Sequence, residues 1–140
     1  MAKIVYVEDE IEIRAIVSEE LLEAGHDVHL AANGLEGLEL ILAEQPDLVI
    51  CDCLMPVMSG IQLLERLRTL HPECRDLPFL FLSAYADKAY GKGVLALGAQ
   101  GYLTKPVDLD RLLETVRALL AGSKRNRTSR LEEADGNASV

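Results

Sequence analysis

The sequence predicts an α/β protein with a doubly wound, five-stranded parallel sheet and helices on both faces. Five short apolar runs, typical of buried strands, alternate with segments that carry apolar residues at helical spacing. The turn signals of a β-hairpin are missing between successive runs. Each strand must therefore continue into a helical crossover, and right-handed crossovers place helices on both faces of a parallel sheet.

The expected strands are short and rich in aliphatic residues, as strands buried on both faces should be. The run PFLFLS is apolar enough to lie in the middle of the sheet. The five strands are expected at residues 3–7, 27–31, 47–51, 78–83 and 101–104.

The first two helices are indicated by their end signals. Residues 11–24 carry apolar side chains at helical spacing, and Gly25 follows where a left-handed C-cap is expected. Asn33 and Glu36 are placed to form a capping box for the second helix, which Pro46 ends.

The later helices carry similar signals. Ser59 and Gln62 offer a capping pair for the third helix, which should end near His71 because a proline follows. The helix expected over 87–97 is weaker, since each of its two glycines costs about 1 kcal/mol relative to alanine. Asp108 can cap a last helix whose apolar face is Leu109, Leu112, Leu113, Val116 and Leu120.

The chain is expected to form one domain over residues 1–121, followed by a flexible polar tail or the start of a linker at 122–140. A length of 140 residues suits a single domain. After residue 121 the sequence is polar and nearly free of aliphatic residues, so it cannot bury enough surface to offset the entropy of ordering. An independent protein and a piece of a longer chain both remain open.

Composition disfavours several classes of protein. The net charge is -9, and residues 1–121 carry 10 basic and 20 acidic side chains, so direct binding to nucleic acid is not expected. The apolar runs are far too short to span a membrane, and the N-terminus lacks a secretory signal. We therefore expect a cytoplasmic protein that does not bind membranes.

Two further patterns that suggest ligand binding are incomplete. Cys51, Cys53, His71 and Cys74 carry zinc-binding side chains, but their spacing does not match the common structural zinc sites, and buried packing is the expected role of the thiols. The glycine-rich segment 91–101 lacks the Lys-Ser/Thr pair of a phosphate loop. The three cysteines, an odd number, are expected to be reduced.

Polar side chains collect where the expected strands end. In an open parallel sheet the carboxyl ends of the strands meet at one edge, which is where ligands bind. We therefore expect acids, a hydroxyl and an amine to converge there. These residues are Glu8, Asp9 and Glu10 after the first strand, Asp52 after the third, Ser83 at the end of the fourth and Lys105 after the fifth.

This set of side chains suits phosphoryl chemistry. Carboxylates within about 5 Å of one another repel by roughly 3 kcal/mol per pair, so one must take a proton or a cation must bind. Oxygen ligands favour Mg²⁺, which keeps coordination positions open for a phosphate. Lys105 and Ser83 could contact phosphoryl oxygens. Asp52 could then act as a carboxylate nucleophile and form an acyl phosphate.

Four motifs at the strand ends carry a resemblance to a known family. They are the acidic pair Glu8-Asp9, DCLMPVMSG at 52–60, Ser83-Ala84 and YLTKP at 102–106. Each is weak alone, but together and in this order they are highly specific. From residue 3 to about residue 121, the sequence resembles the receiver domain of two-component response regulators, including the single-domain chemotaxis type.

The resemblance implies a phosphorylation site and a metal site. It implies that Asp52 accepts a phosphoryl group from a phosphohistidine on a histidine kinase or a histidine phosphotransfer protein. Asp9, Asp52 and the backbone carbonyl of Leu54 would bind Mg²⁺ directly, with Glu8 acting through water. Lys105 would contact the phosphoryl group.

The resemblance also implies a conformational switch and a topology. Ser83 would move toward the phosphoryl group and Tyr102 would turn inward, which changes the partner preference of the fourth helix, fifth strand and fifth helix. Phosphorylation could also produce a homodimer. The family fold is flavodoxin-like with strand order 2-1-3-4-5, and a cis peptide is implied at Lys105-Pro106.

The leading hypothesis is thus a signalling switch of a two-component system or phosphorelay, and not a turnover enzyme. One alternative is an aspartate-nucleophile phosphatase of the haloacid dehalogenase kind, which needs Asp-x-Asp where this chain has Leu54 as the third residue. Another is a receiver-like domain that binds partners without phosphate. Leu54 and Tyr85 offer no carboxylate or carboxamide to orient water, so slow self-dephosphorylation is expected.

Overall fold

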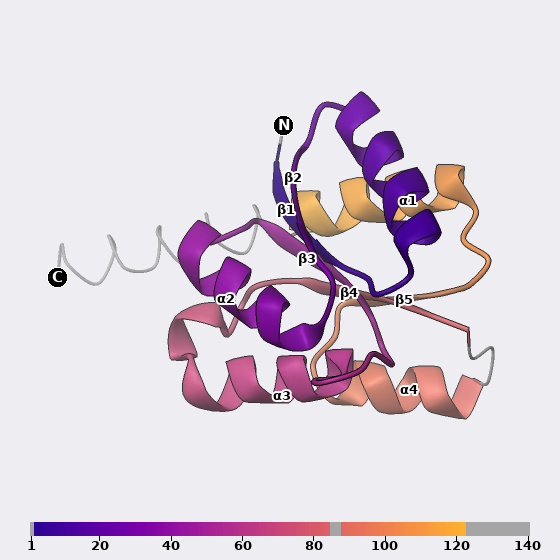
Figure 1. Cartoon of the computed structure of the whole chain (residues 1–140). Helices are drawn as coiled ribbons and strands as arrows, with labels where there is room; N and C mark the ends of the chain where they lie inside the picture. The colour runs from indigo at the N-terminus through magenta and orange to yellow at the C-terminus, as the bar shows by residue number, and fades with distance from the viewer. Residues whose placement is uncertain (1, 85–87, 123–140) are drawn as a thin grey trace, which may run out of the picture.

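Five parallel strands form one sheet in the order β2-β1-β3-β4-β5 (Figure 1). The computed structural model describes residues 2–84 and 88–122. The observed order confirms the predicted fold class and the flavodoxin-like topology. The strands are β1 (Lys3–Val7), β2 (Asp27–Ala31), β3 (Leu48–Asp52), β4 (Phe79–Ser83) and β5 (Gly101–Thr104).

The predicted strand bounds hold within one residue. β3 begins and ends one residue later than expected, so Asp52 is the last residue of the strand and not the first residue after it. The reason is tertiary, because Asp52 still pairs with Leu82 in the β3–β4 ladder. β4 begins one residue later than expected, at Phe79.

Helices cover both faces of the sheet (Figure 1). One face packs against α1 and the C-terminal helix, of which residues 109–122 are described, and the other against α2, α3 and α4. The labelled helices are α1 (Ile11–Glu23), α2 (Gly34–Glu44), α3 (Gly60–Leu70) and α4 (Lys88–Ala96), with a short 3₁₀ turn, η1 (Pro72–Cys74), after α3.

The helix ends follow the expected signals, with one difference. Ser59 and Gln62 form the full capping box of α3, and Asp108 accepts two backbone N–H bonds at the start of the C-terminal helix. Asn33 accepts the N–H of Glu36 as expected. The carboxylate of Glu36, however, accepts the backbone N–H of Ala32 and the side-chain amide of Asn33, and not the backbone N–H of Asn33.

The alternation of side chains along β3 places Asp52 and the two thiols on opposite faces of the sheet. Cys51 and Cys53 are fully buried in the core beneath α2 and α3, and neither forms a disulfide. Leu48 and Ile50 face α1 and the C-terminal helix. Because successive side chains of a strand point to opposite faces, Asp52 lies on the side of Leu48 and Ile50.

Three expectations reach past the described residues. The tail predicted at 122–140 lies outside them from residue 123 on, and residue 122 is helical, contrary to that prediction. Residue 87 of the fourth helix and Tyr85 also lie outside. Within 2–84 and 88–122, the structure contains no helix with the length and apolar composition needed to cross a bilayer.

Candidate functional site

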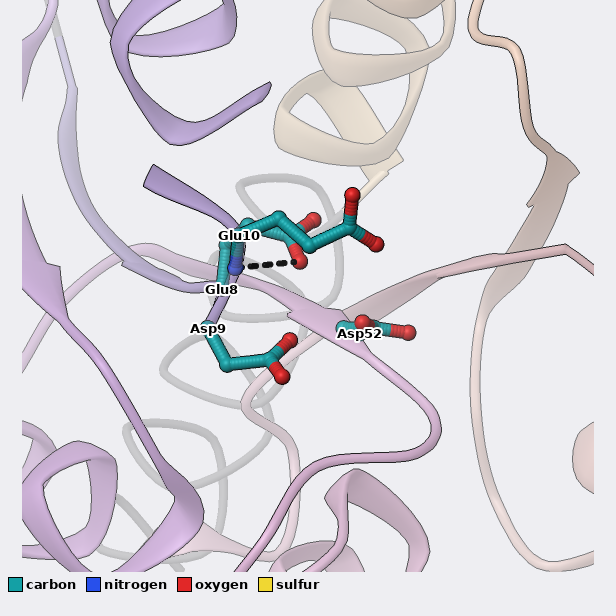
Figure 2. A group of neighbouring side chains, drawn as sticks. All are labelled: Glu8, Asp9, Glu10 and Asp52. Carbon is teal, nitrogen blue, oxygen red and sulfur yellow. Dashed lines mark hydrogen bonds between the residues drawn. The ribbon is translucent and has the colours of Figure 1, made fainter. Parts of the chain in front are cut away.

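Four carboxylates meet at the carboxyl edge of the sheet (Figure 2). Glu8, Asp9 and Glu10 follow β1, and Asp52 ends the neighbouring strand β3. One carboxylate oxygen from each of the four lies within 4.8 Å of the others. In Figure 2 the carboxylate of Asp9 points toward Asp52. The sheet topology therefore brings the expected acids together.

Lys105 faces this acidic group from the end of β5. Its Nζ lies 2.9 Å from Glu8 Oε1, 3.3 Å from Asp52 Oδ2 and 3.6 Å from Glu10 Oε1. Burial lowers the pKa of Lys105, but the hydrogen bond that it donates to Glu8 and the charges of Asp52 and Glu8 outweigh this effect, so the pKa is raised. Lys105 therefore stays protonated at neutral pH and binds both acids.

Glu8 is the most deeply buried acid of the group, with no exposed surface. Its Oε1 accepts hydrogen bonds from Lys105 Nζ and the Tyr6 hydroxyl, and its Oε2 accepts the N–H of Glu10. Burial raises the pKa of Glu8 to about 7, helped by the Asp52 charge and opposed by Lys105. The site thus carries one carboxyl group that titrates near neutral pH.

The raised pKa of Glu8 predicts that stability falls as pH rises. Between the ordinary pKa of 4.5 and about 7 the folded protein holds this proton more tightly than the unfolded chain. The free energy of unfolding should therefore drop by on the order of 3 kcal/mol from below pH 4.5 to above pH 7. Denaturant titrations without divalent cations should show this loss in the wild type and a flatter profile in Glu8→Gln. Equal slopes in the two proteins would contradict it.

The donor set fits a hard divalent cation. Carboxylates this close repel by roughly 3 kcal/mol per pair at an effective dielectric of about 20, and Lys105 offsets only part of that repulsion. Oxygen-only ligands favour Mg²⁺ or a similar ion. This is the one group of at least three His, Cys, Asp or Glu side chains in residues 2–84 and 88–122 whose ligand atoms come close enough to hold a metal ion.

The other expected site residues lie around this group. Ser83 is buried at the end of β4, and its carbonyl accepts the N–H of Lys105 at 2.6 Å. The N–H of Leu54 donates to Asp52 Oδ1 at 3.4 Å, while the Leu54 side chain is about half exposed. Tyr102 is half-buried on β5 and packs against the core beneath α2, α3 and α4. The cis peptide expected at Lys105-Pro106 is present.

The loop after Asp52 contains a strained turn. Val57 has φ 72°, and the N–H of Met58 donates to the Pro56 carbonyl at 2.8 Å, which makes a three-residue turn around Val57. A β-branched residue is unfavourable at positive φ. The loop is nevertheless fixed, because the Met58 carbonyl accepts the N–H of Gly34 at the start of α2.

Replacing Val57 by glycine should stabilise the protein. Glycine adopts positive φ without strain, and the Val57 side chain is 76% exposed, so little packing is lost. Relief of about 1–3 kcal/mol of backbone strain exceeds the added entropy cost of glycine, and the net gain should be about 1 kcal/mol. Urea unfolding midpoints measure the change. Val57→Ala keeps a Cβ and should gain less; equal gains would show that strain is not the cause.

Sequence reasoning gave no role in the site to three residues that act on the acidic group. Glu10 was expected at this edge but was given no role, although it pairs with Lys105. Tyr6 was placed only in a buried strand, yet its hydroxyl reaches Glu8. Arg14 on α1 donates to the Glu8 carbonyl at 2.9 Å. The alternation of β1, which puts residues 6 and 8 on one face, was the signal for Tyr6.

Fold and site together define a doubly wound α/β domain with an acidic, lysine-capped edge. The family model described as "Response regulator receiver domain" matches residues 4–117. The chain belongs to the response regulator receiver domain family, which comprises signalling domains of two-component systems. Their signalling depends on phosphorylation.

Relatives of known name are similar over most of the chain. Sensor kinase CckA of Brucella abortus is 39% identical over 121 residues, which cover 85% of this chain and 12% of that protein. Sporulation initiation phosphotransferase F of Bacillus subtilis is 32% identical over 118 residues, covering 84% of this chain and 93% of that protein. The chain spans about half of the transcriptional regulator RpaA of Synechocystis, at 37% identity over 137 residues and 96% of this chain.

Solved receiver structures share the fold. The receiver domain of the Francisella response regulator 1452 superposes with a TM-score of 0.82 at 30% identity, covering 88% of this chain and 99% of that one. Chemotaxis protein CheY4 of Vibrio cholerae gives a TM-score of 0.79 at 34% identity, covering 85% and 98%. These likenesses agree with the observed strand order and helix placement.

Proposed function

We propose that this chain is a phosphorylation-activated signalling switch in which Asp52 accepts a phosphoryl group with the help of Mg²⁺. The observation that carries the proposal is the pairing of Asp52 with Lys105 at 3.3 Å beside three further carboxylates. A buried acid without a partner is energetically unfavourable. Asp52 instead lies at the carboxyl edge of the sheet, where the Lys105 ammonium pairs with its charge. Asp52 is only slightly exposed, yet its carboxylate faces this group.

The proposed reaction is a transfer between a nitrogen and a carboxylate oxygen. An oxygen of the Asp52 carboxylate attacks the phosphorus of a phosphohistidine on a kinase or phosphotransfer protein. The P–N bond breaks, its electron pair returns to the imidazole, which takes up a proton, and a P–O bond forms the acyl phosphate. Lys105 then binds the phosphoryl oxygens as a point charge, and the Ser83 hydroxyl donates to one of them.

Asp9 and Asp52 would hold the Mg²⁺ ion, together with the Leu54 carbonyl, and Glu8 would act through water. When bound, the ion supplies positive charge against the oxygens of the transferring phosphoryl group. Glu8 also keeps Lys105 in place, because its Oε1 is the nearest acceptor of the Lys105 ammonium. The side chains of this site would thus position the ion and Lys105, which place positive charge beside the phosphoryl oxygens.

The proposed output is a change of the surface formed by α4, β5 and the C-terminal helix. Ser83 and Tyr102 lie on neighbouring strands, and a shift of Ser83 toward the phosphoryl group gives Tyr102 room to turn inward. The α4 side of this surface carries the exposed side chains of Leu95 and Leu97, which a partner or a second copy could cover. Histidine kinases or histidine phosphotransfer proteins are the proposed phosphodonors, since the relatives include a sensor kinase and a phosphotransferase.

Intact mass spectrometry after incubation with Mg²⁺ and acetyl phosphate tests the proposal. The expected result is one added phosphoryl group, which is absent when EDTA removes the metal. No mass gain in a folded protein that binds Mg²⁺ would contradict the proposal and favour a binding module that works without phosphate. Continuous release of phosphate from many monoesters would instead favour the phosphatase, although Leu54 offers that reaction no second acid.

A further inference from the structure

A buried tyrosine lies directly beneath the acidic group. Tyr6 is in the middle of β1 and has no exposed surface, and its side chain belongs to the core beneath α1 and the C-terminal helix. Ile4, Tyr6 and Glu8 share one face of the strand because side chains alternate. The Tyr6 hydroxyl therefore points along this face and donates to Glu8 Oε1 at 3.4 Å.

A hydroxyl at this depth requires a partner. Burying an unpaired hydroxyl is unfavourable, and the neighbouring core residues Ile4, Leu48 and Ile50 are aliphatic, so they cannot accept its hydrogen bond. Burial and the Glu8 carboxylate raise the pKa of Tyr6, so the phenol keeps its proton and remains a donor. Its acceptor is the Glu8 side chain.

Glu8 is held from three sides. Oε1 accepts from Lys105 Nζ and from the Tyr6 hydroxyl, and Oε2 accepts the N–H of Glu10. The backbone carbonyl of Glu8 accepts a hydrogen bond from the Arg14 guanidinium. Donors from β1, from the loop that follows it and from α1 therefore fix both the backbone and the carboxylate of Glu8.

We propose that Tyr6 is a positioning residue of the cation site, whose hydroxyl fixes the Glu8 carboxylate so that Glu8 holds Lys105 and contacts the cation only through water. This inference rests on the proposed Mg²⁺ site. Outer-sphere partners that orient metal-binding acids commonly affect affinity about tenfold or more. Tyr6 lies one shell further out, because Glu8 contacts the cation through water, so its effect should be at or below the lower end of that range.

Loss of the hydroxyl should weaken Mg²⁺ binding without removing the site. In Tyr6→Phe the ring still fills the core, but Oε1 keeps Lys105 as its remaining side-chain donor and the carboxylate can rotate. One hydrogen bond of about 1 kcal/mol corresponds to a roughly fivefold change in affinity. We expect the Mg²⁺ affinity to fall roughly five- to tenfold.

Calorimetric titration of the full chain with Mg²⁺ tests this inference at a fixed pH above 8. Ile4→Val is the matched control, because Ile4 lies on the same face of β1 and in the same core but its aliphatic side chain forms no hydrogen bond to Glu8. It should lose stability and keep wild-type affinity. In a Glu8→Gln background, adding Tyr6→Phe should change the affinity less than twofold, because the hydroxyl acts through that carboxylate.

The outcomes separate this inference from the function on which it rests. The inference is supported if Tyr6→Phe binds Mg²⁺ more weakly and Ile4→Val does not. Tyr6→Phe should then need more Mg²⁺ for phosphorylation but reach the wild-type phosphorylation rate at saturating Mg²⁺. Wild-type affinity in Tyr6→Phe, or an equal loss in Ile4→Val, overturns the inference and leaves the Mg²⁺ site intact. If the wild type binds no Mg²⁺, both the inference and the proposed metal site fail.

Discussion

Asp52→Asn is expected to abolish phosphoryl incorporation from acetyl phosphate, with a fall of at least about a hundredfold in the phosphorylated fraction. The amide has no carboxylate oxygen to attack phosphorus. The fold should be retained, because the change removes one of four crowded negative charges. Intact mass and thermal unfolding, measured on the same samples, give the two readouts.

A matched variant separates the acceptor from the metal ligands. Asp9→Asn removes one carboxylate of the same group but keeps Asp52, so phosphorylation should persist and require more Mg²⁺. A phosphoryl group on the Asp52→Asn protein would show that another carboxylate is the acceptor. Peptide mapping after borohydride reduction would then identify it, and the assignment of Asp52 would be wrong.

Gly60→Ala is expected to destabilise the protein by about 3 kcal/mol and to slow phosphorylation. A Cβ at this position would overlap the Asp52 carbonyl oxygen, and it would come within 2.8 Å of the Phe81 ring and 2.9 Å of Cys51 Sγ. The start of α3 packs directly on the end of β3, so backbone atoms must move. Because the displaced carbonyl belongs to Asp52, the acceptor should move with it.

Gly93→Ala is the matched control for this substitution. Gly93 lies inside α4, and a Cβ there would have open space around it. Alanine is the better helix former, so this variant should gain about 1 kcal/mol. Denaturant midpoints of the two variants should therefore move in opposite directions. A similar loss in both would show that the contacts of Gly60 are not the cause.

Much of the fold could be predicted from local signals. The alternation of apolar runs with helical spacing located all five strands within one residue, because burial on both faces requires continuous aliphatic runs. Ser59, Asp108 and Gly25 marked helix ends, since caps satisfy backbone groups within a few residues. The strand order came from the family resemblance, because periodicity says nothing about which strands are neighbours.

The acids of the site were predictable for a related reason. Parallel strands bring their carboxyl ends to one edge, so Glu8, Asp9 and Asp52 were expected there, and they meet because β1 and β3 are neighbours in the sheet. Lys105 followed from the same rule. The rule does not predict which acid pairs most closely with Lys105. In the structure, Lys105 lies closer to Glu8 than to Asp52.

By itself, the sequence determined the class of fold, the places where helices begin and end, and the set of side chains at the carboxyl edge, because each depends on periodicity or on neighbours along the chain. Only the tertiary structure decided that Tyr6 supports Glu8, that Val57 takes a positive φ and that Gly60 has no room for a side chain. Those features depend on how separate elements pack, and packing distances are set by the whole core.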